Sequence, residues 1–303
     1  MFRRSLTPVQ DLSKVHHSVS ELFVWPSKAS DWDQYRLKPE QIEFFHEYGW
    51  LAGVPILEEM QIEKLKEELQ DLMDPEHPGH ALFYEFHLNE SSDTNTILFH
   101  SLGAWRIAKG FHDLLWNPAI AMAASQLLDD HSVRFWHDQL FSKPAKKGGV
   151  VAWHQDYSYW TRTKPMAHIT CWCSLDDSTV ENGCLQYVSG SHKWGLLDKP
   201  ELAGDLFNIL DYLSPEQKAA FKPVSVETKA GQAIFHHPLT LHGSGENKSQ
   251  RQRRAFVINA FADGVKSDSD QSLLEGVPVI SRGHKMEGQF FPLIFEGPRG
   301  SLS

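Results

Sequence analysis

The chain has 303 residues, of which 41% are hydrophobic and 12% aromatic, so it can bury one large core or two modest ones. Its formal net charge of −10 argues against nucleic acid or an anionic membrane as the main partner, and no run approaches the ~18 apolar residues of a membrane span. Three cysteines, and the lack of an apolar stretch after the basic Met1–Arg4, lead us to expect a cytoplasmic protein.

The sequence pattern predicts one domain over residues 1–303, divided into consecutive parts. Residues 1–32 are weakly patterned and predict an arm that lies over the surface. Residues 33–132 have mostly helical periodicity, and residues 133–262 carry short β-type runs interrupted by an insertion at 197–223. A C-terminal segment, 263–303, completes the chain.

Two helices are predicted within residues 33–132. Over Glu58–Met73 the apolar residues recur at helical spacing and form one stripe, and Asp74-Pro75 ends the pattern. Before Ala119–Leu128, Asn117 and Pro118 supply a cap and a proline at the first helical position. Both stripes are typical of helices that pack on a sheet.

From residue 133 onward the pattern changes to short β-type runs, broken by Gly, Asn and Asp. The predicted strands are Val133–Lys143, His168–Leu175, Leu185–Val188, Val224–Glu227, Ala233–His236 and Ala255–Ala262. Many short strands favour a double-stranded β-helix, or jelly-roll, whose interior holds the functional site. We therefore predict a mainly β core with flanking helices.

The insertion at 197–223 carries a helix signal of its own. Ser214-Pro215-Glu216-Gln217 has the pattern of a capping box, with proline in the first helical turn. Two roles are open for the insertion. It is either a lid that covers the substrate at the mouth of the barrel, or a surface excursion without a part in catalysis.

Two short segments carry side chains that suit a metal ion. In an extended segment alternate residues point to the same side, so His154 and Asp156 can address one metal while Gln155 faces away. A third ligand has to come from elsewhere in the chain, and His242 in His242-Gly243-Ser244 is the candidate. Two imidazoles and one carboxylate suit iron(II), whereas thiolate-rich sets suit zinc or iron–sulfur clusters.

Arg253 follows His242 by eleven residues and begins a β-type run. Its planar guanidinium can hold both oxygens of a carboxylate, as the far end of a dicarboxylic 2-oxo acid requires. A bare H-x-D occurs often by chance in a chain with 17 histidines, but its combination with a distant His and a following Arg is much more specific. The alternatives in the same segments are His236, His237, Arg251 and Arg254.

From Pro39 to Ala262 the chain resembles the phytanoyl-CoA dioxygenase family of iron(II)/2-oxoglutarate-dependent oxygenases. The resemblance is sharpest in the segments His154-Gln155-Asp156, Glu181–Leu185, Ser189–Lys193 and His237–Asn247, followed by Arg253. It implies that iron(II) is bound by His154, Asp156 and His242. It also implies that Arg253 anchors the co-substrate 2-oxoglutarate, with Trp172, Ser244 and Gln139 as further co-substrate neighbours and O2 as the second co-substrate.

The resemblance further implies hydroxylation of an unactivated C–H bond in a small organic or lipid-like substrate, with release of succinate and CO2. Family members that halogenate lack the carboxylate found here at Asp156, so its presence favours hydroxylation, while desaturation, epoxidation and ring closure use the same ligands. Two alternatives are a cupin-like metal enzyme that does not use 2-oxoglutarate and a non-catalytic binding module on the same fold. No feature of the sequence predicts an oligomeric state.

Several other side chains have both a functional and a structural interpretation. Cys171, Cys173 and Cys184 could form a zinc site, but such cysteines are more often buried small hydrophobes. The aromatic residues that flank the metal motif could line a substrate pocket; they are Trp153, Tyr157, Tyr159 and Trp160. His192 and Arg162 could contact substrate, and the apolar run Gln289–Phe295 is interpreted as a docked tail or a subunit contact.

Overall fold

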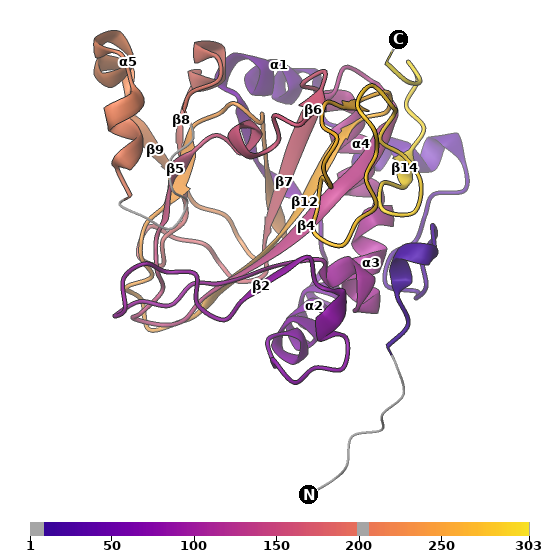
Figure 1. The fold of residues 1–303 in the computed structure, drawn as a ribbon, viewed down its shortest axis with the longest axis horizontal. Helices are drawn as coiled ribbons and strands as arrows, with labels where there is room; N and C mark the ends of the chain where they lie inside the picture. The colour runs from indigo at the N-terminus through magenta and orange to yellow at the C-terminus, as the bar shows by residue number, and fades with distance from the viewer. Residues whose placement is uncertain (1–8, 199–205, 303) are drawn as a thin grey trace, which may run out of the picture.

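Two antiparallel β-sheets pack against each other in this computed structural model, which describes residues 9–198 and 206–302 (Figure 1). In spatial order, the large sheet contains β1 (Trp50–Pro55), β10 (Gln232–His236), β7 (His168–Ser174), β12 (Arg253–Ala262), β4 (Val133–Lys143), β3 (Phe99–Leu102) and β2 (Glu85–His87), with β14 (Leu293–Phe295) also paired to β4. The small sheet contains β5 (Val151–His154), β11 (His242–Ser244), β8 (Leu185–Val188) and β9 (Pro223–Val226). A short ribbon pairs β13 (Lys266–Ser267) with β6 (Thr163–Lys164).

Alternation along the central strands divides their side chains between two cores. On β12, Ala255 and Val257 point between the two sheets, where they join Trp172 and Leu185 in one hydrophobic cluster. Phe256 and Ile258, the intervening residues, face the helices on the other side of the large sheet. A β-strand places successive side chains on opposite faces, so one strand supplies both the barrel interior and the helix-covered core.

Four helices cover the outer face of the large sheet, on the side away from β5, β8 and β9 (Figure 1). They are α1 (Pro39–Tyr48), α2 (Glu59–Leu72), α3 (Lys109–Asp113) and α4 (Pro118–Leu127). The predicted stripe of α2 is buried against this core, and the Asn117 side chain caps α4 by accepting from the backbone N–H of Ala119 at 2.9 Å. The described part of the N-terminal arm lies against α3, because Asp113 accepts from the backbone N–H groups of Val19 and Ser20.

The predicted double-stranded β-helix with flanking helices is confirmed, with strand ends that match to within one or two residues. Most of the regular structure in residues 33–132 is helical, as predicted, but this part also contributes β1, β2 and β3 to the large sheet. β2 has three residues and β3 four, which is too short for an alternating pattern to be recognised.

The insertion at 197–223 packs behind the small sheet in its described part, residues 206–223. Its helix α5 (Pro215–Ala220) has the predicted capping box at Ser214. Its apolar side chains pack on the outer face of the small sheet, where the Phe221 ring lies 5.1 Å from that of Trp153. Residues 199–205, which belong to the same prediction, lie outside the described residues.

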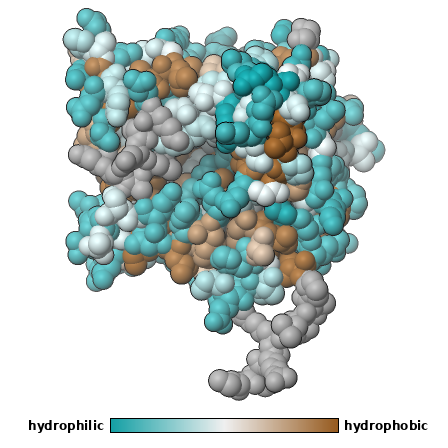
Figure 2. Space-filling view, viewed as in Figure 1, coloured by the Kyte–Doolittle hydropathy of each residue, from teal (hydrophilic) through white to brown (hydrophobic). Residues whose placement is uncertain are grey.

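The face of the molecule seen in Figure 2 is largely hydrophilic, and its hydrophobic side chains lie in separate patches. Within residues 9–198 and 206–302, no helix combines the length and the apolar character needed to cross a membrane. The run Gln289–Phe295 is a docked tail, because Leu293 and Phe295 pair with β4 and Phe291 is buried in the main core.

Candidate active site

His154 and Asp156 reach the barrel interior from the end of β5. His154 is the last residue of that strand, Gln155 is still extended, and Asp156 begins a short 3-10 turn, η6 (Asp156–Tyr159). The Gln155 amide faces away and donates to the backbone carbonyls of Gly195 at 2.9 Å and Leu239 at 2.8 Å. The predicted alternation is therefore confirmed, although Asp156 belongs to a turn and not to a strand.

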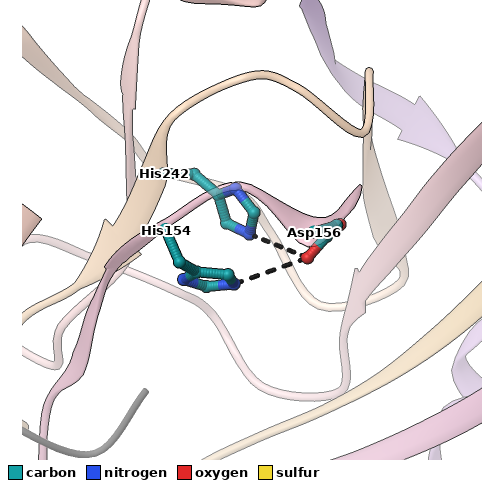
Figure 3. A group of neighbouring side chains, drawn as sticks. All are labelled: His154, Asp156 and His242. Atoms are coloured by element: carbon teal, nitrogen blue, oxygen red, sulfur yellow. Dashed lines mark ion pairs between the residues drawn. The ribbon is translucent and has the colours of Figure 1, made fainter. Parts of the chain in front are cut away.

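His242 joins this pair from β11, where it lies directly opposite His154 in the antiparallel register. Both imidazole Nε2 atoms point at one oxygen of Asp156, at 3.4 Å from His154 and 3.6 Å from His242 (Figure 3). One potential ligand atom from each of the three side chains lies within 4.8 Å of the others. This donor set and its grouping on one side fit the facial triad of a non-haem iron(II) site.

Backbone carbonyls determine which ring nitrogen of each histidine is free. His154 Nδ1 lies 2.8 Å from the carbonyl oxygen of Ala152, and His242 Nδ1 lies 3.0 Å from that of Thr240. Each Nδ1 therefore carries the proton and donates, which leaves the Nε2 lone pair directed at the metal position. Burial, together with the nearby imidazoles of His154 and His236, holds the pKa of His242 well below its ordinary value.

The second oxygen of Asp156 is held by two neighbouring side chains. Asp156 Oδ2 accepts from Thr170 Oγ1 at 2.6 Å and from His236 Nε2 at 2.9 Å. His236 is oriented in turn by Tyr187, whose hydroxyl lies 2.9 Å from Nδ1. Burial raises the pKa of Asp156, but the surrounding imidazoles outweigh this effect and hold the pKa well below its ordinary value. His236 therefore orients the carboxylate, and the ionised Oδ1 stays directed at the metal position.

Arg253 is the arginine that points into the barrel. Its neighbour Arg254 forms a two-point ion pair with Asp176, with both contacts at 2.8 Å, and Arg251 is exposed. Arg253 is only 1% exposed, and its guanidinium carbon lies 5.4 Å from the ring centre of Trp172. Burial lowers its pKa to about 10, so it remains charged at neutral pH. No acceptor in the described part of the chain reaches its buried Nε.

A glycine contact positions the Arg253 side chain. Arg253 Nη1 donates to the backbone carbonyl of Gly183, at 2.5 Å. Gly183 has a φ of +77°, and a Cβ at this position would lie 2.3 Å from the carbonyl oxygen of Gly245. Only glycine fits this close approach of two loops without strain.

All seven predicted site residues line one cavity of about 420 Å³; they are His154, Asp156, His242, Arg253, Trp172, Ser244 and Gln139. Ser244 Oγ accepts from the ammonium of Lys143 at 2.6 Å, and Gln139 Oε1 lies 3.0 Å from His100 Nε2. The reasoning from sequence missed Lys143 and His100. Lys143 is in phase with Gln139 on the same predicted strand, so the two-residue period of that strand could have identified it.

The other candidates separate into cavity-lining and structural residues. Tyr159, Trp160 and Arg162 line the cavity, whereas Trp153 packs outside the small sheet. The zinc interpretation is wrong, since Cys171 and Cys173 face the helices and the one metal-competent group in the described residues is the His–Asp–His set. Tyr157 and His192 do not reach the cavity; the Tyr157 hydroxyl donates to the carbonyl of Thr163, and His192 contacts the carbonyl of His46.

Comparisons with known proteins agree with this geometry. A family model described as phytanoyl-CoA dioxygenase (PhyH) matches residues 45–255. A phytanoyl-CoA dioxygenase from Arabidopsis thaliana is 29% identical over 267 residues, covering 77% of this chain and 92% of that protein. L-proline trans-4-hydroxylase from Streptomyces griseoviridis is 26% identical over 234 residues, covering 69% and 81% of the two chains.

Solved structures show a similar fold. The crystal structure of the epimerase SnoN in complex with Fe3+, alpha ketoglutarate and nogalamycin RO superposes with a TM-score of 0.70 at 20% identity, covering 88% of this chain and 100% of that chain. The match to the family model spans more than half of the chain. The chain therefore belongs to the phytanoyl-CoA dioxygenase family and is a non-haem iron, 2-oxoglutarate-dependent oxygenase.

Proposed function

We propose that this enzyme hydroxylates an unactivated C–H bond of a small, partly apolar organic molecule. In this proposal His154, Asp156 and His242 hold iron(II), and Arg253 binds the distal carboxylate of 2-oxoglutarate. Trp172, Ser244 and Gln139 form the remaining wall around the co-substrate. The observation that carries the proposal is the convergence on one cavity of the His–Asp–His set and the buried Arg253 guanidinium, which has no carboxylate partner among the described residues.

The side chains divide the work of binding and orientation. When bound, iron(II) with 2-oxoglutarate and O2 supplies the oxidising chemistry, which yields succinate and CO2. The three ligands lie on one face, so the opposite face is left for co-substrate and O2. Thr170 and His236 hold one oxygen of Asp156 and leave the other for the metal. A carboxylate at this position favours hydroxylation over halogenation, because it takes the place that a halide needs.

The cavity wall supports a substrate with apolar character and no large negative charge. Its apolar and aromatic side chains include Trp136, Tyr159, Trp160, Leu102, Leu273 and Leu274. The charged side chains toward the surface are Glu85, Glu90 and Arg162, and the Arg162 guanidinium already donates to the backbone carbonyls of Ser272 and Leu273. A polyanionic coenzyme A thioester would meet the carboxylate of Glu85 and that of Glu90, which lies 2.7 Å from His100 Nδ1, so a neutral or cationic small molecule fits better.

A co-substrate consumption assay tests this function. Purified protein is incubated with iron(II) and 2-oxoglutarate in air, and succinate is measured with panels of small organic molecules and of acyl-CoA thioesters. We expect iron-dependent succinate release that increases with a small-molecule substrate and yields a product heavier by one oxygen atom. His154→Ala should abolish the release, whereas the exposed control His284→Ala should not. Stimulation by acyl-CoA thioesters alone would contradict the proposed substrate class, and a wild-type protein without iron-dependent succinate release would contradict the proposed activity.

A further inference from the structure

Lys143 is a fully buried lysine beside the proposed co-substrate site. It is the last residue of β4 and lies directly opposite Arg253 of β12 in the sheet register. Its side chain has no exposed surface, and its ammonium donates to Ser244 Oγ at 2.6 Å and to the carbonyl oxygen of Gly245 at 2.7 Å. Lysine is almost never fully buried without a partner of opposite charge, so this placement calls for an explanation.

In the described part of the chain, neither Lys143 nor Arg253 forms an ion pair. Among residues 9–198 and 206–302, no carboxylate lies within 4.0 Å of either cation. Two buried like charges side by side are costly unless an anion joins them. Burial and the neighbouring Arg253 hold the pKa of Lys143 well below its ordinary value, so an anion bound at this point would favour the protonated lysine.

The hydrogen bond from Lys143 also determines what Ser244 can do. Ser244 Oγ accepts from the ammonium, so its own hydroxyl proton has to point elsewhere. In the described chain no acceptor receives that proton, while the Ser244 side chain lines the same cavity as Arg253. The hydroxyl is thereby preset as a donor toward an anion in the cavity, next to the guanidinium.

We propose that Lys143 is a positioning residue for the distal carboxylate of the co-substrate. It acts through Ser244, whose hydroxyl proton it directs at the carboxylate, and it adds a second positive charge behind Arg253. It thereby helps the enzyme select dicarboxylic over monocarboxylic 2-oxo acids. The inference rests on the proposed function, because it assumes that 2-oxoglutarate binds with its distal carboxylate at Arg253.

Calorimetric titration of Mn(II)-loaded protein tests the inference without turnover. The titrants are 2-oxoglutarate and 2-oxobutyrate, which lacks the distal carboxylate. For Lys143→Met, the loss of a charge-assisted interaction should weaken 2-oxoglutarate binding roughly 10- to 100-fold and leave 2-oxobutyrate binding unchanged. Lys147→Met removes the same charge from an exposed position four residues further along and should leave both affinities unchanged. If Lys143→Met does not fold, Lys143→Gln, which retains an N–H donor but not the charge, carries the same comparison.

A double-mutant comparison with Ser244→Ala distinguishes a positioning role of Lys143 from a general structural role. If Lys143 acts through the hydroxyl, Lys143→Met should weaken 2-oxoglutarate binding much less in a Ser244→Ala background than in the wild type. The metal-free Lys143→Met protein should melt at the wild-type temperature or above it, because a buried charge has been replaced by an apolar chain of similar length.

Three results would overturn the inference. The first is an unchanged affinity of Lys143→Met for 2-oxoglutarate, and the second is an equal loss of affinity for both 2-oxo acids. The third is a lower melting temperature of Lys143→Met together with additive effects of Lys143→Met and Ser244→Ala on 2-oxoglutarate binding. A wild-type protein that shows no preference for 2-oxoglutarate over 2-oxobutyrate would instead contradict the proposed function. The two failures are therefore distinguishable.

Discussion

The Thr170 hydroxyl offers a direct test of how the proposed iron ligands are held. It donates to Asp156 Oδ2 at 2.6 Å from a fully buried position on β7. Thr170→Val removes this hydrogen bond, together with the 2.9 Å contact of the same hydroxyl to Asn259 Oδ1, with almost no change in volume, and His236 remains as the other donor to the same Asp156 oxygen. The carboxylate then keeps its charge but loses half of the contacts that orient it.

The expected magnitude follows from the contact that is lost. A hydrogen bond to a charged group contributes roughly 1.5–3 kcal/mol. Loss of an outer partner of a metal ligand typically weakens metal binding by about 10- to 100-fold, which is about 1.4–2.8 kcal/mol. We therefore expect Thr170→Val to weaken iron(II) binding by one to two orders of magnitude, with only a small change in the concentration of 2-oxoglutarate needed once the metal is saturating.

Anaerobic titration of the metal-free protein with iron(II) measures this effect. Thr228→Val is the matched control, because Thr228 is also buried but its hydroxyl contacts that of Ser174, outside the cavity. Equal iron affinity in Thr170→Val and wild type would refute the reasoning, and so would an equal loss in the control.

Three further predictions follow from contacts described above. Arg253→Ala should raise the KM for 2-oxoglutarate strongly while iron affinity changes little, and an unchanged KM would place the anchor elsewhere. Gly183→Ala should lower the free energy of unfolding, measured by urea denaturation, by about 1–3 kcal/mol, because the added Cβ would lie 2.3 Å from the backbone oxygen of Gly245. Gly190→Ala, with a φ of +78° but open space around the Cβ, should cost less, so equal losses in the two variants would contradict the steric argument. Burial lowers the pKa of His168 from 6.5 to about 3, so the unfolded chain binds a proton that the folded protein excludes over this range. The free energy of unfolding should therefore decrease as the pH falls from about 6.5 towards 3, by at most about 1.4 kcal/mol per pH unit from this residue, and His168→Gln should show a shallower dependence in urea titrations.

The strands and the metal motif could be predicted because each carries a local pattern. The alternation around His154 and Asp156 depends only on extended backbone, and the structure shows both side chains pointing in a common direction. The choice among three neighbouring arginines could not be made from strand alternation, because both Arg251 and Arg253 occupy odd positions. Tertiary contacts decide it: Arg251 lies before the strand and is exposed, and Asp176 holds Arg254 on the outer face.

The surface against which the insertion at 197–223 packs could not be predicted from the sequence, for a different reason. Its capping box at Ser214 is local and was recognised, but the surface against which a short helix packs depends on distant residues. Trp153 points outward from the small sheet and is covered by Ile209 and Leu213, which places the described part of the insertion behind the sheet. The sequence around His154 does not show that Trp153, on the other face of β5, leaves apolar surface that the insertion has to cover.

Leu273 and Leu274 form a part of the cavity wall that is separate in the chain from the proposed iron ligands. Both leucines line the cavity, yet they belong to the segment that follows β12, whereas the proposed iron ligands come from β5, η6 and β11. Arg162 fastens that segment by donating to the carbonyls of Ser272 and Leu273. Substitutions at Leu273 and Leu274 would therefore reshape this wall of the cavity and leave the proposed iron ligands in place.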